Sequence, residues 1–308
     1  MHSGFVSIIG RPNVGKSTLL NTVIGEKIAI VSNKPQTTRN RLQGIYTSDK
    51  GQIIFVDTPG IHKPKHLLGE YMVSVSERSL AEVDLVYYVV DVTQKFGGGE
   101  QYIIDQLQNL QTPVFLILNK IDLVSEEMLQ QVQREFTDKM RFAEIIPLSA
   151  LTKENMERLL DLTFDYLPPG PLYYPKDDLT DQPIYFLVME IIREKALLLT
   201  HDEIPHSLAV EIEEFKNDSK NRKYIRAFIY TERDSQKGII IGKQGQMLKE
   251  IGSLARADIE ALLNERVYLD LWVKVKKKWR DNEAQLKKLG YKRSEEHTSE
   301  LQSRSAIS

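Results

Sequence analysis

The sequence of 308 residues contains no cysteine. This absence excludes disulfides, zinc–thiolate sites and thiol nucleophiles, and it is compatible with a reducing compartment. The sequence also lacks any apolar run of about 18 residues, which argues against a membrane-spanning helix, and Phe5–Ile9 begins a strand where a signal peptide would stand. The net charge is only −2, so binding of nucleic acid would depend on a local basic patch. We therefore expect a cytoplasmic protein.

The first half of the chain alternates short apolar runs with helix-length segments, which predicts an α/β fold with a mostly parallel sheet covered on both faces. Ligands of such sheets bind at the carboxyl ends of the strands, and three of the runs end there in a polar residue. The predicted strands are Phe5–Ile9, Gln52–Asp57, Leu85–Asp91, Val114–Asn119 and Glu144–Pro147.

A break in this pattern divides the chain into two expected domains, residues 1–167 and residues 184–292. Residues 168–183 between them are rich in proline, which cannot continue a helix or a central strand, so we interpret them as a linker. The second domain is predicted to be a smaller α+β unit, a mixed sheet with helices on one side. Its predicted helices are Ile184–Thr200 and Gln246–Leu263, its strands are Ser207–Phe215, Tyr224–Thr231 and Val267–Val275, and Gly238–Ile241 is a short turn or helix.

Residues 293–308 are rich in serine and show no periodicity, so we expect them to be disordered. They resemble the translation of a sequencing-adapter oligonucleotide, and we interpret them as a sequence artefact. A natural disordered tail is the alternative, and no functional interpretation is based on these residues.

The segment GRPNVGKS follows the first predicted strand, precedes a helix and fits the pattern GxxxxGK[ST] of phosphate-binding loops. Its glycines let successive backbone N–H groups point at phosphate oxygens, and the helix N-terminus adds partial positive charge. Lys16 is expected to reach the β- and γ-phosphates of a nucleotide. The residues expected to contact the phosphates are Gly10, Arg11, Pro12, Asn13, Val14, Gly15, Lys16, Ser17 and Thr18.

A magnesium ion is expected beside this loop, with Ser17 as a ligand and Asp57 holding it mostly through water. Asp57 opens the turn DTPG, which ends the second predicted strand, and the Gly60 N–H could contact the γ-phosphate. DxxG is a weak signal alone, but its position one β-unit after the phosphate loop strengthens it. The residues of this second switch are Asp57, Thr58, Pro59 and Gly60.

Specificity for guanine is predicted from NKID at the end of the fourth predicted strand. Asp122 could accept two hydrogen bonds, from N1–H and from the exocyclic amine of guanine, whereas adenine would leave this carboxylate unpaired. Lys120 could lie along the base and brace the phosphate loop, and the Ala150 N–H is placed to meet guanine O6. The expected guanine-binding residues are Asn119, Lys120, Asp122, Ser149, Ala150 and Leu151.

The order GxxxxGKS, DTPG, NKID, SAL resembles the translation-factor-related branch of GTPases over about residues 4–167. QTTRN lies between the first two motifs and resembles the first switch of that branch, in which a threonine completes the Mg²⁺ shell when GTP is bound. By register with that branch this is Thr38, with Thr37 as the alternative. The residues of this first switch are Gln36, Thr37, Thr38, Arg39 and Asn40.

Ile61 stands where Ras-type enzymes carry the glutamine that orients the attacking water, so slow intrinsic hydrolysis of GTP is predicted. Arg11, Arg39 and Arg41 are the candidates for an arginine finger within the chain. Related GTPases with an asparagine in the place of Asn13 use potassium there, and such an ion would stabilise negative charge on the β- and γ-phosphates. We therefore expect Mg²⁺ and, from this resemblance, K⁺ as cofactors.

The tetrapeptide GKQG lies between an apolar run and a helix and resembles the GXXG loop of KH domains. Its glycines allow the backbone close to a phosphate–sugar chain, and Lys243 adds positive charge. GXXG is weak alone, but the order helix, strand, strand, helix, GXXG, helix, strand is the type II KH arrangement.

A basic segment follows the last predicted strand, with nine Lys or Arg and two acidic residues between Lys274 and Arg293. With Trp272 and Trp279 it suits single-stranded nucleic acid, although a solvated helix face with packed tryptophans is the alternative. The expected RNA-binding residues are Gly242, Lys243, Gln244, Gly245, Lys249, Lys274, Lys276, Lys277 and Lys278.

A GTPase domain joined to a type II KH domain resembles the bacterial Era GTPases, and QTTRN, EIIREK, EIPHS, IIIGKQG and LWVKVKKKW extend the resemblance over about residues 3–292. The resemblance implies a switch that binds GTP and GDP, binds the 3′ end of 16S ribosomal RNA and acts in maturation of the 30S subunit. It also implies a fraction bound peripherally to the cytoplasmic face of the cell membrane. We expect a monomer whose second domain moves on the linker.

Two other functions are compatible with the sequence. A GTPase scaffold at the membrane, in which RNA binding is secondary, would use the basic segment to meet anionic lipid. An RNA-modifying enzyme with a GTPase switch has less support, because the sequence shows no metal cluster, thiol or cofactor motif for it.

Overall fold

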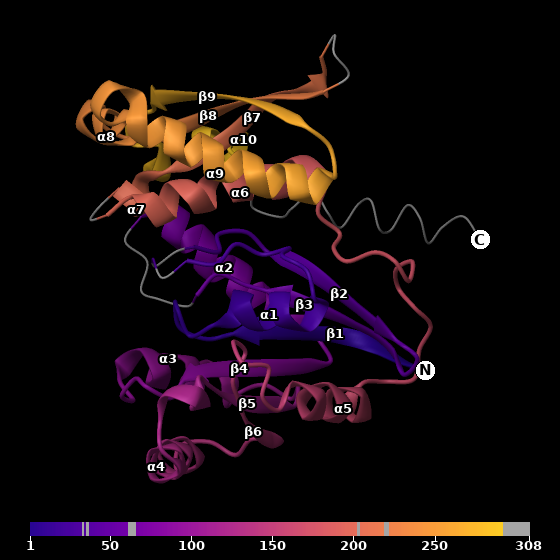
Figure 1. The fold of residues 1–308 in the computed structure, drawn as a ribbon. Helices are drawn as coiled ribbons and strands as arrows, with labels where there is room; N and C mark the ends of the chain where they lie inside the picture. The colour runs from indigo at the N-terminus through magenta and orange to yellow at the C-terminus, as the bar shows by residue number, and fades with distance from the viewer. Residues whose placement is uncertain (33, 35–36, 61–65, 202–203, 219–221, 292–308) are drawn as a thin grey trace.

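The computed structural model of the chain describes residues 1–32, 34, 37–60, 66–201, 204–218 and 222–291. The predictions about Gln36, Ile61 and residues 293–308 lie outside this part of the chain. Figure 1 shows two units stacked on one another, the first in indigo to magenta below and the second in orange to yellow above.

The first unit is built on a six-stranded sheet with the order β2-β3-β1-β4-β5-β6. All neighbouring strands pair in parallel except β2 and β3, which form an antiparallel hairpin at the edge. The strands are β1 (His2–Ile9), β2 (Leu42–Ser48), β3 (Gly51–Asp57), β4 (Leu85–Asp91), β5 (Val114–Asn119) and β6 (Glu144–Leu148). The predicted mostly parallel α/β fold is confirmed, whereas the short, largely polar strand β2 was absent from the prediction.

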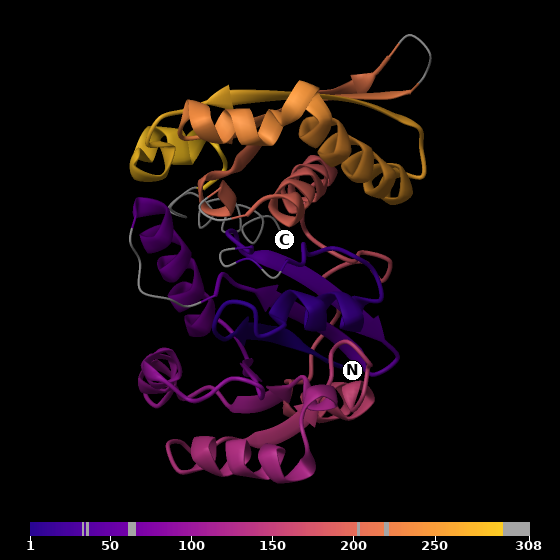
Figure 2. The ribbon, with the colours of Figure 1, turned by 60° about the vertical axis from the view of Figure 1, so that its left-hand side comes forward.

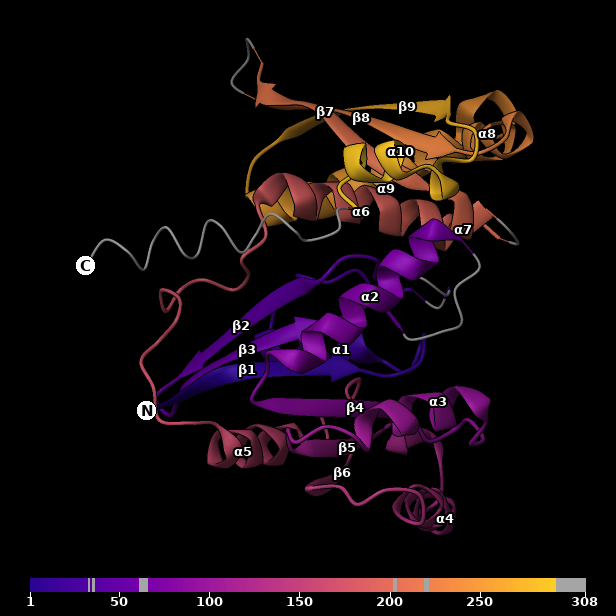
Figure 3. The same cartoon turned by 180° about the vertical axis from the view of Figure 1, so that it is seen from behind.

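Helices cover both faces of this sheet, as Figures 1 and 3 show from opposite sides. Two helices, α1 (Lys16–Ile24) and α5 (Met156–Tyr166), share one apolar core with the sheet. The helices α2 (Leu67–Ala81), α3 (Gly98–Leu107) and α4 (Glu126–Thr137) cover the other face. Both faces of β3, β4 and β5 are buried, which explains why these strands are continuous apolar runs in the sequence.

The second unit has a three-stranded sheet in the order β7-β8-β9, antiparallel between β7 and β8 and parallel between β8 and β9. Four helices contribute to a single core on one face of it, and Figure 2 shows this helical layer between the sheet and the first unit. The elements are α6 (Ile184–Leu199), α7 (Ile204–Ser207), β7 (Ala209–Asn217), β8 (Lys223–Thr231), α8 (Asp234–Ile241), η2 (Lys243–Gly245), α9 (Gln246–Leu263), β9 (Val267–Val275), η3 (Trp279–Asp281) and α10 (Glu283–Lys288). The predicted smaller α+β unit is confirmed, with one addition: η3 and α10 pack on the opposite face of the sheet, against Phe228 and Tyr230.

The proline-rich stretch after α5 packs along the first sheet. The side-chain oxygen of Gln52 accepts hydrogen bonds from the backbone N–H groups of Tyr173 and Tyr174, each at 2.9 Å. Further along, Ile45 N–H donates to Leu179 O at 2.9 Å and the Thr180 hydroxyl donates to a β2 carbonyl. The linker therefore covers the edge of β2, which confines any hinge to the few residues before α6.

No helix in the described ranges is both long enough and apolar enough to cross a membrane.

Replacing Gln52 by alanine should loosen this attachment. Gln52 is fully buried, and its amide also donates to Tyr174 O at 3.1 Å, so the substitution removes the partner of three backbone groups. We expect the free energy of unfolding to fall by about 1–3 kcal/mol in a urea titration, with faster proteolysis within residues 168–183. Gln130→Ala, an exposed site on α4, should change it by less than about 0.5 kcal/mol. Equal stability of the two variants would show that the linker is held by other contacts.

Candidate functional site

The loop between β1 and α1 approaches its neighbours so closely that glycine is required at two positions. A Cβ atom on Gly10, whose φ is +150°, would lie 2.3 Å from the Val89 carbonyl oxygen. A Cβ atom on Gly15, whose φ is +104°, would lie 2.2 Å from the side-chain nitrogen of Asn119. The loop is thus wedged between the ends of β4 and β5, and it leads into the N-terminus of α1, where backbone N–H groups attract anions.

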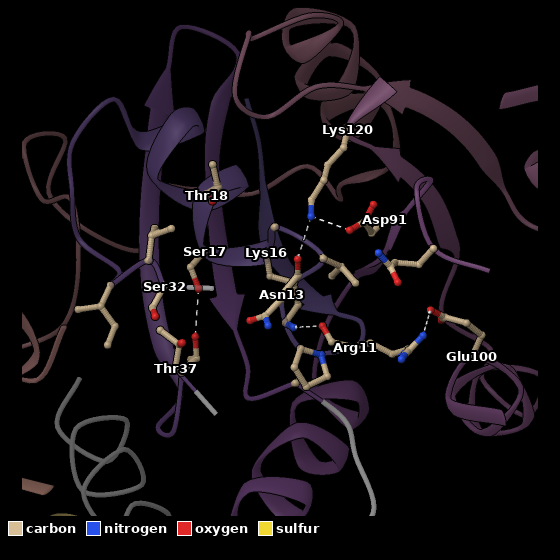
Figure 4. Close-up of a pocket in the computed structure, with 18 residues that line it drawn as sticks. Arg11, Asn13, Lys16, Ser17, Thr18, Ser32, Thr37, Asp91, Glu100 and Lys120 are labelled. Atoms are coloured by element: carbon tan, nitrogen blue, oxygen red, sulfur yellow. Dashed lines mark hydrogen bonds and ion pairs between the residues drawn. The ribbon is translucent and has the colours of Figure 1, made fainter. Parts of the chain in front are cut away.

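Lys16 lies across the inside of this loop. Its ammonium group donates hydrogen bonds to the carbonyls of Gly10 at 3.1 Å and Arg11 at 2.9 Å. Figure 4 shows the second of these bonds. Burial lowers the pKa of Lys16 to about 8, against the attraction of Asp57. A cavity of about 530 Å³ opens beside it, lined among others by loop residues 11–17 and by Thr18, Thr37, Thr38 and Gly60. A buried cation at the wall of such a cavity is suited to bind phosphate.

Three oxygens that could hold Mg²⁺ meet beside the loop. The Ser17 hydroxyl lies 2.8 Å from an Asp57 carboxylate oxygen and 3.0 Å from the Thr38 hydroxyl. The Thr38 hydroxyl is 3.4 Å from the same Asp57 oxygen. The other oxygen of Asp57 is buried without a hydrogen-bond partner among the described residues, and burial raises the pKa of this carboxyl group. A buried carboxylate beside two hydroxyls fits a hard dication that prefers oxygen ligands.

The two candidate threonines of the first switch point in different directions. The Thr38 hydroxyl joins Ser17 and Asp57, whereas the Thr37 hydroxyl donates to the Lys34 carbonyl at 2.6 Å. Of the two threonines, Thr38 therefore has its hydroxyl at the expected Mg²⁺ position. Asn40, which follows, accepts a hydrogen bond from the Tyr71 hydroxyl of α2 at 3.1 Å.

The DTPG turn lies against the phosphate loop. A Cβ atom on Gly60 would lie 2.7 Å from the backbone nitrogen of Pro12, so the glycine permits this approach. The Thr58 hydroxyl donates to the Ile8 carbonyl at 3.0 Å, and the Pro59 carbonyl accepts from Ser76 of α2. The turn thus connects β3, the loop and the helix that faces the second unit.

The side chain of Asn119 holds two loops together. It donates to the Val14 carbonyl at 2.8 Å and accepts from the Ala150 N–H at 3.0 Å. The Ala150 N–H, which we expected to meet guanine O6, is therefore engaged by Asn119 in this structure. Thr22 of α1 donates to the Ala150 carbonyl at 2.8 Å, a contact that the sequence motifs do not indicate.

Lys120 is held between the phosphate loop and β4. Its ammonium group donates to the Asn13 carbonyl at 3.1 Å and lies 2.6 Å from Asp91, as Figure 4 shows. Asp91 is buried, and its other oxygen accepts two hydrogen bonds from Thr93. Sequence reasoning missed the role of Asp91, although its place at the end of a buried strand is the signal that could have found it.

The remaining guanine candidates lie at the outer end of the site. Asp122 is exposed in a 3₁₀ turn, η1 (Ile121–Leu123), and Leu151 is also exposed. The buried Ser149 accepts a hydrogen bond from the Thr152 N–H, which shapes the loop after β6. Six residues that line the phosphate cavity were not predicted, namely Ile30, Val31, Ser32, Asp91, Gln94 and Glu100.

The three candidates for an arginine finger either bind other residues of the protein or are exposed to solvent. Arg11 is paired with Glu100 of α3 at 3.6 Å, which turns its guanidinium away from the loop centre (Figure 4). Arg39, one of the three candidates, is buried at 1 % exposure and binds carbonyls of the second unit, so in this structure it is not placed to act as an arginine finger. Arg41 is exposed, and its charge lies near Asp181 of the linker.

The GKQG loop connects α8 to α9 through a sharp turn. Gly242, Gln244 and Gly245 all have positive φ, at 73°, 52° and 78°. A Cβ atom on Gly242 would lie 2.6 Å from Met247 Cβ, whereas one on Gly245 would have nothing within 4 Å. Lys243, Gln244 and Lys249 are exposed around the N-terminus of α9, an arrangement suited to a phosphate–sugar backbone.

The basic segment after β9 divides into an exposed and a buried part. Lys274, Lys277 and Lys278 are exposed, whereas the Lys276 ammonium group is buried over the Tyr230 ring, 3.8 Å from its centre. Burial lowers the pKa of Lys276, and in this structure its ammonium group faces the protein, not solvent as a contact with RNA would require. Trp279 is fully buried, so it cannot stack on a base, while Trp272 remains exposed.

Two protein-family models match the chain. The family described as 50S ribosome-binding GTPase matches residues 5–120, which contain the phosphate loop, the DTPG turn and Asn119 with Lys120. The family described as KH domain matches residues 203–280, which contain the GKQG loop.

Solved structures of Era are similar along nearly the whole length. Era from Aquifex aeolicus bound to GDP·AlF4⁻ shares 41 % of its residues with this chain and superposes with a TM-score of 0.92. The match covers 94 % of this chain and 99 % of that one. The same identity, coverage and TM-score apply to Era in complex with MgGDPNP and nucleotides 1506–1542 of 16S ribosomal RNA.

Replacing Asp91 by asparagine should weaken binding of guanine nucleotides. Asparagine keeps the size of the side chain but removes the charge that orients Lys120, and a charge-assisted contact of this kind contributes about 1.5–3 kcal/mol. We expect the Kd for GDP, measured by titration calorimetry, to rise about tenfold.

Asp105→Asn, on the exposed face of α3, serves as the control and should leave the Kd unchanged. If Asp91→Asn also leaves it unchanged, Asp91 only caps the turn at Thr93.

Proposed function

The chain belongs to the Era family of GTPases, and we propose that it is a GTP-hydrolysing switch that binds the 3′ end of 16S ribosomal RNA during assembly of the 30S subunit. One observation carries the proposal. The Ser17–Thr38–Asp57 cluster beside a phosphate loop occurs in the same chain as an exposed GKQG loop between two helices of a KH domain.

Hydrolysis of GTP depends on positioning and charge, because little covalent chemistry falls to the protein. Mg²⁺ bound at Ser17, Thr38 and Asp57 would neutralise charge on the β- and γ-phosphates. Lys16 provides a fixed positive charge at the loop, and the backbone N–H groups at the start of α1 provide further donors. With Arg11 and Arg39 engaged by other partners, slow intrinsic turnover is the expected behaviour.

The choice of guanine rests on the outer part of the site. Asp122 is exposed toward solvent at the carboxyl edge of the sheet, and Lys120 beside it is braced between Asn13 and Asp91. A carboxylate there discriminates against adenine, which lacks the pair of donors that guanine presents.

A monovalent cation, K⁺, is part of the proposal. Asn13 lines the phosphate cavity at the outer bend of the loop, with φ at 67°. Its amide oxygen can coordinate a large monovalent cation, which would stabilise the transition state without an arginine finger.

We further propose that the protein acts as a cytoplasmic monomer, with a fraction bound peripherally at the cell membrane. Exposed lysines gather near the end of the second unit, including Lys277, Lys278 and Lys287. Such a group is attracted to anionic lipid as well as to RNA. The RNA experiment below therefore also tests the alternative function, a membrane scaffold in which RNA binding is secondary.

The potassium proposal predicts that GTP turnover is faster in K⁺ than in Na⁺ at equal ionic strength, by about tenfold. Asn13→Ala should remove this difference while leaving the rate in Na⁺ nearly unchanged. Phosphate release under single-turnover conditions measures both. Equal rates of the unaltered protein in the two salts would contradict the proposal.

The RNA proposal predicts that Gly245→Asp weakens binding of a short RNA with the 16S 3′ sequence by about tenfold or more, because a carboxylate then faces the phosphates. Filter binding should also show tighter binding with a GTP analogue than with GDP. Gly25→Asp is a matched control, since both glycines have positive φ and open space around the Cβ position. Normal 30S maturation in cells that carry Gly245→Asp would favour the membrane scaffold instead.

A further inference from the structure

We propose that the second unit forms part of the GTPase centre: Arg39 and Arg193 anchor the first switch on the KH domain and thereby hold the Thr38 hydroxyl beside Ser17 and Asp57. The inference rests on the proposed GTPase function and identifies positioning residues for it. Neither arginine touches the cavity that receives the phosphates. Both act through Thr38.

The side chain of Arg39 is inserted into the second unit. It is 1 % exposed, and its guanidinium group donates to the backbone carbonyls of Leu208 and, at 3.1 Å, of Pro205. It also donates to the Tyr291 hydroxyl at 3.3 Å and lies 5.7 Å from the centre of the Trp279 ring. All four partners belong to the C-terminal unit. A fully buried charge is tolerated only where such partners hold it in a fixed geometry.

Arg193 approaches the same segment from α6. It is also 1 % exposed, and it is oriented by Glu190 of its own helix, with a hydrogen bond of 2.8 Å from its Nε. Its terminal nitrogen Nη2 donates to the backbone carbonyl of Thr37. Arg193 therefore connects helix α6 directly to the peptide group between Thr37 and Thr38.

Thr38 is held from both sides as a result. The carbonyl before it is bound by Arg193, and the side chain after it is buried in the second unit. Its own hydroxyl points the opposite way, to Ser17 at 3.0 Å. A segment anchored through the Thr37 carbonyl and the Arg39 side chain has little freedom, so the position of the Thr38 hydroxyl between them depends on where the KH domain sits.

The same part of the second unit also contacts helix α2, which follows the second switch in the sequence. The ring of Tyr291 packs edge-on against Tyr71 of α2, with centres 6.1 Å apart, and Leu68 and Met72 join the apolar cluster around Trp279. Figure 3 shows α2 reaching up to α7 and α10. The residues around Trp279 and Tyr291 thus contact Arg39 of the first switch and helix α2, whose Ser76 donates a hydrogen bond to the Pro59 carbonyl of the second switch.

Loss of this anchoring should affect hydrolysis of GTP and not binding of GDP. A nucleotide without a γ-phosphate would be held by Lys16, Ser17 and the guanine loops, and Arg39 makes its hydrogen bonds to none of these but to the second unit. Hydrolysis of GTP additionally needs the Thr38 hydroxyl in the Mg²⁺ shell. Loss of Arg39 should therefore lower turnover and weaken the apparent affinity for Mg²⁺ during turnover, with little change in affinity for GDP.

The decisive experiment is a double-mutant cycle between Arg39 and Thr38 in the full-length protein. We expect Thr38→Ala to lower kcat for GTP about 100-fold, Arg39→Ala about tenfold, and the double variant no more than Thr38→Ala alone. The Mg²⁺ concentration that gives half-maximal turnover should rise about tenfold in Arg39→Ala. The Kd for GDP should stay within about twofold of the unaltered protein, which also shows that the variant is folded.

Two further variants separate positioning from general loosening. Arg193→Lys keeps the charge and a donor, and should retain most of the turnover that Arg193→Ala loses. Lys27→Ala removes an ion pair across the same interface, at 2.5 Å from Glu194, without touching the segment around Thr38, and should leave kcat unchanged.

The outcomes are distinct. Additive losses in the cycle, or an equal loss in Lys27→Ala, would show that Arg39 does not act through Thr38 and would overturn the inference. Unchanged kcat and Mg²⁺ dependence in Arg39→Ala would overturn it as well. Absence of GTP turnover in the unaltered protein would instead refute the proposed function, and the measured affinity for GDP distinguishes that failure from a failure to fold.

Discussion

The whole site depends on one constraint, that the parallel strands of the first sheet end at the same edge. The loops after β1, β3, β4, β5 and β6 meet there, and the side-chain amide of Asn119 joins two of them by bonding Val14 and Ala150. The close contact of Gly15 with Asn119 leaves no room for any side chain at that point. Because a buried amide must satisfy both its donor and its acceptor, this link sets the distance between the phosphate-binding and guanine-binding parts.

The second unit is attached to this edge by polar contacts that are unusually buried. Two arginines with 1 % exposure, Arg39 and Arg193, bond to backbone carbonyls across the interface, and Glu194 accepts from the Val31 N–H at 2.9 Å. Burying charges in this way contributes little net stability, because desolvation offsets the attraction. What such contacts do provide is a defined geometry, which is what a nucleotide-dependent switch requires.

The GKQG loop and the nucleotide site lie far apart in the sequence, but the packed helices of the second unit connect them in space. The GKQG loop lies at the far end of α9 from the linker, while α6 and α7 of the same unit hold the first switch. Rigid helices can transmit a displacement between such sites, provided that both ligands favour the same arrangement of the two units. The docked linker, bonded to Gln52 and β2, limits which arrangements are available.

The sequence by itself determined the local chemistry of this protein. A phosphate loop, a DTPG turn and NKID are local patterns, and continuous apolar runs identify buried strands. The fold class and the candidate nucleotide-binding residues could therefore be predicted from the sequence. Only the tertiary structure decided where the long basic side chains go. Arg39 and Lys276 look like exposed cations in the sequence but are buried beside Trp279 and Tyr230, and Asp91 acquires its role only because Lys120 reaches it. The physical reason is that burial and ion pairing depend on residues more than a hundred positions apart, such as Arg39 and Tyr291, which no local pattern encodes.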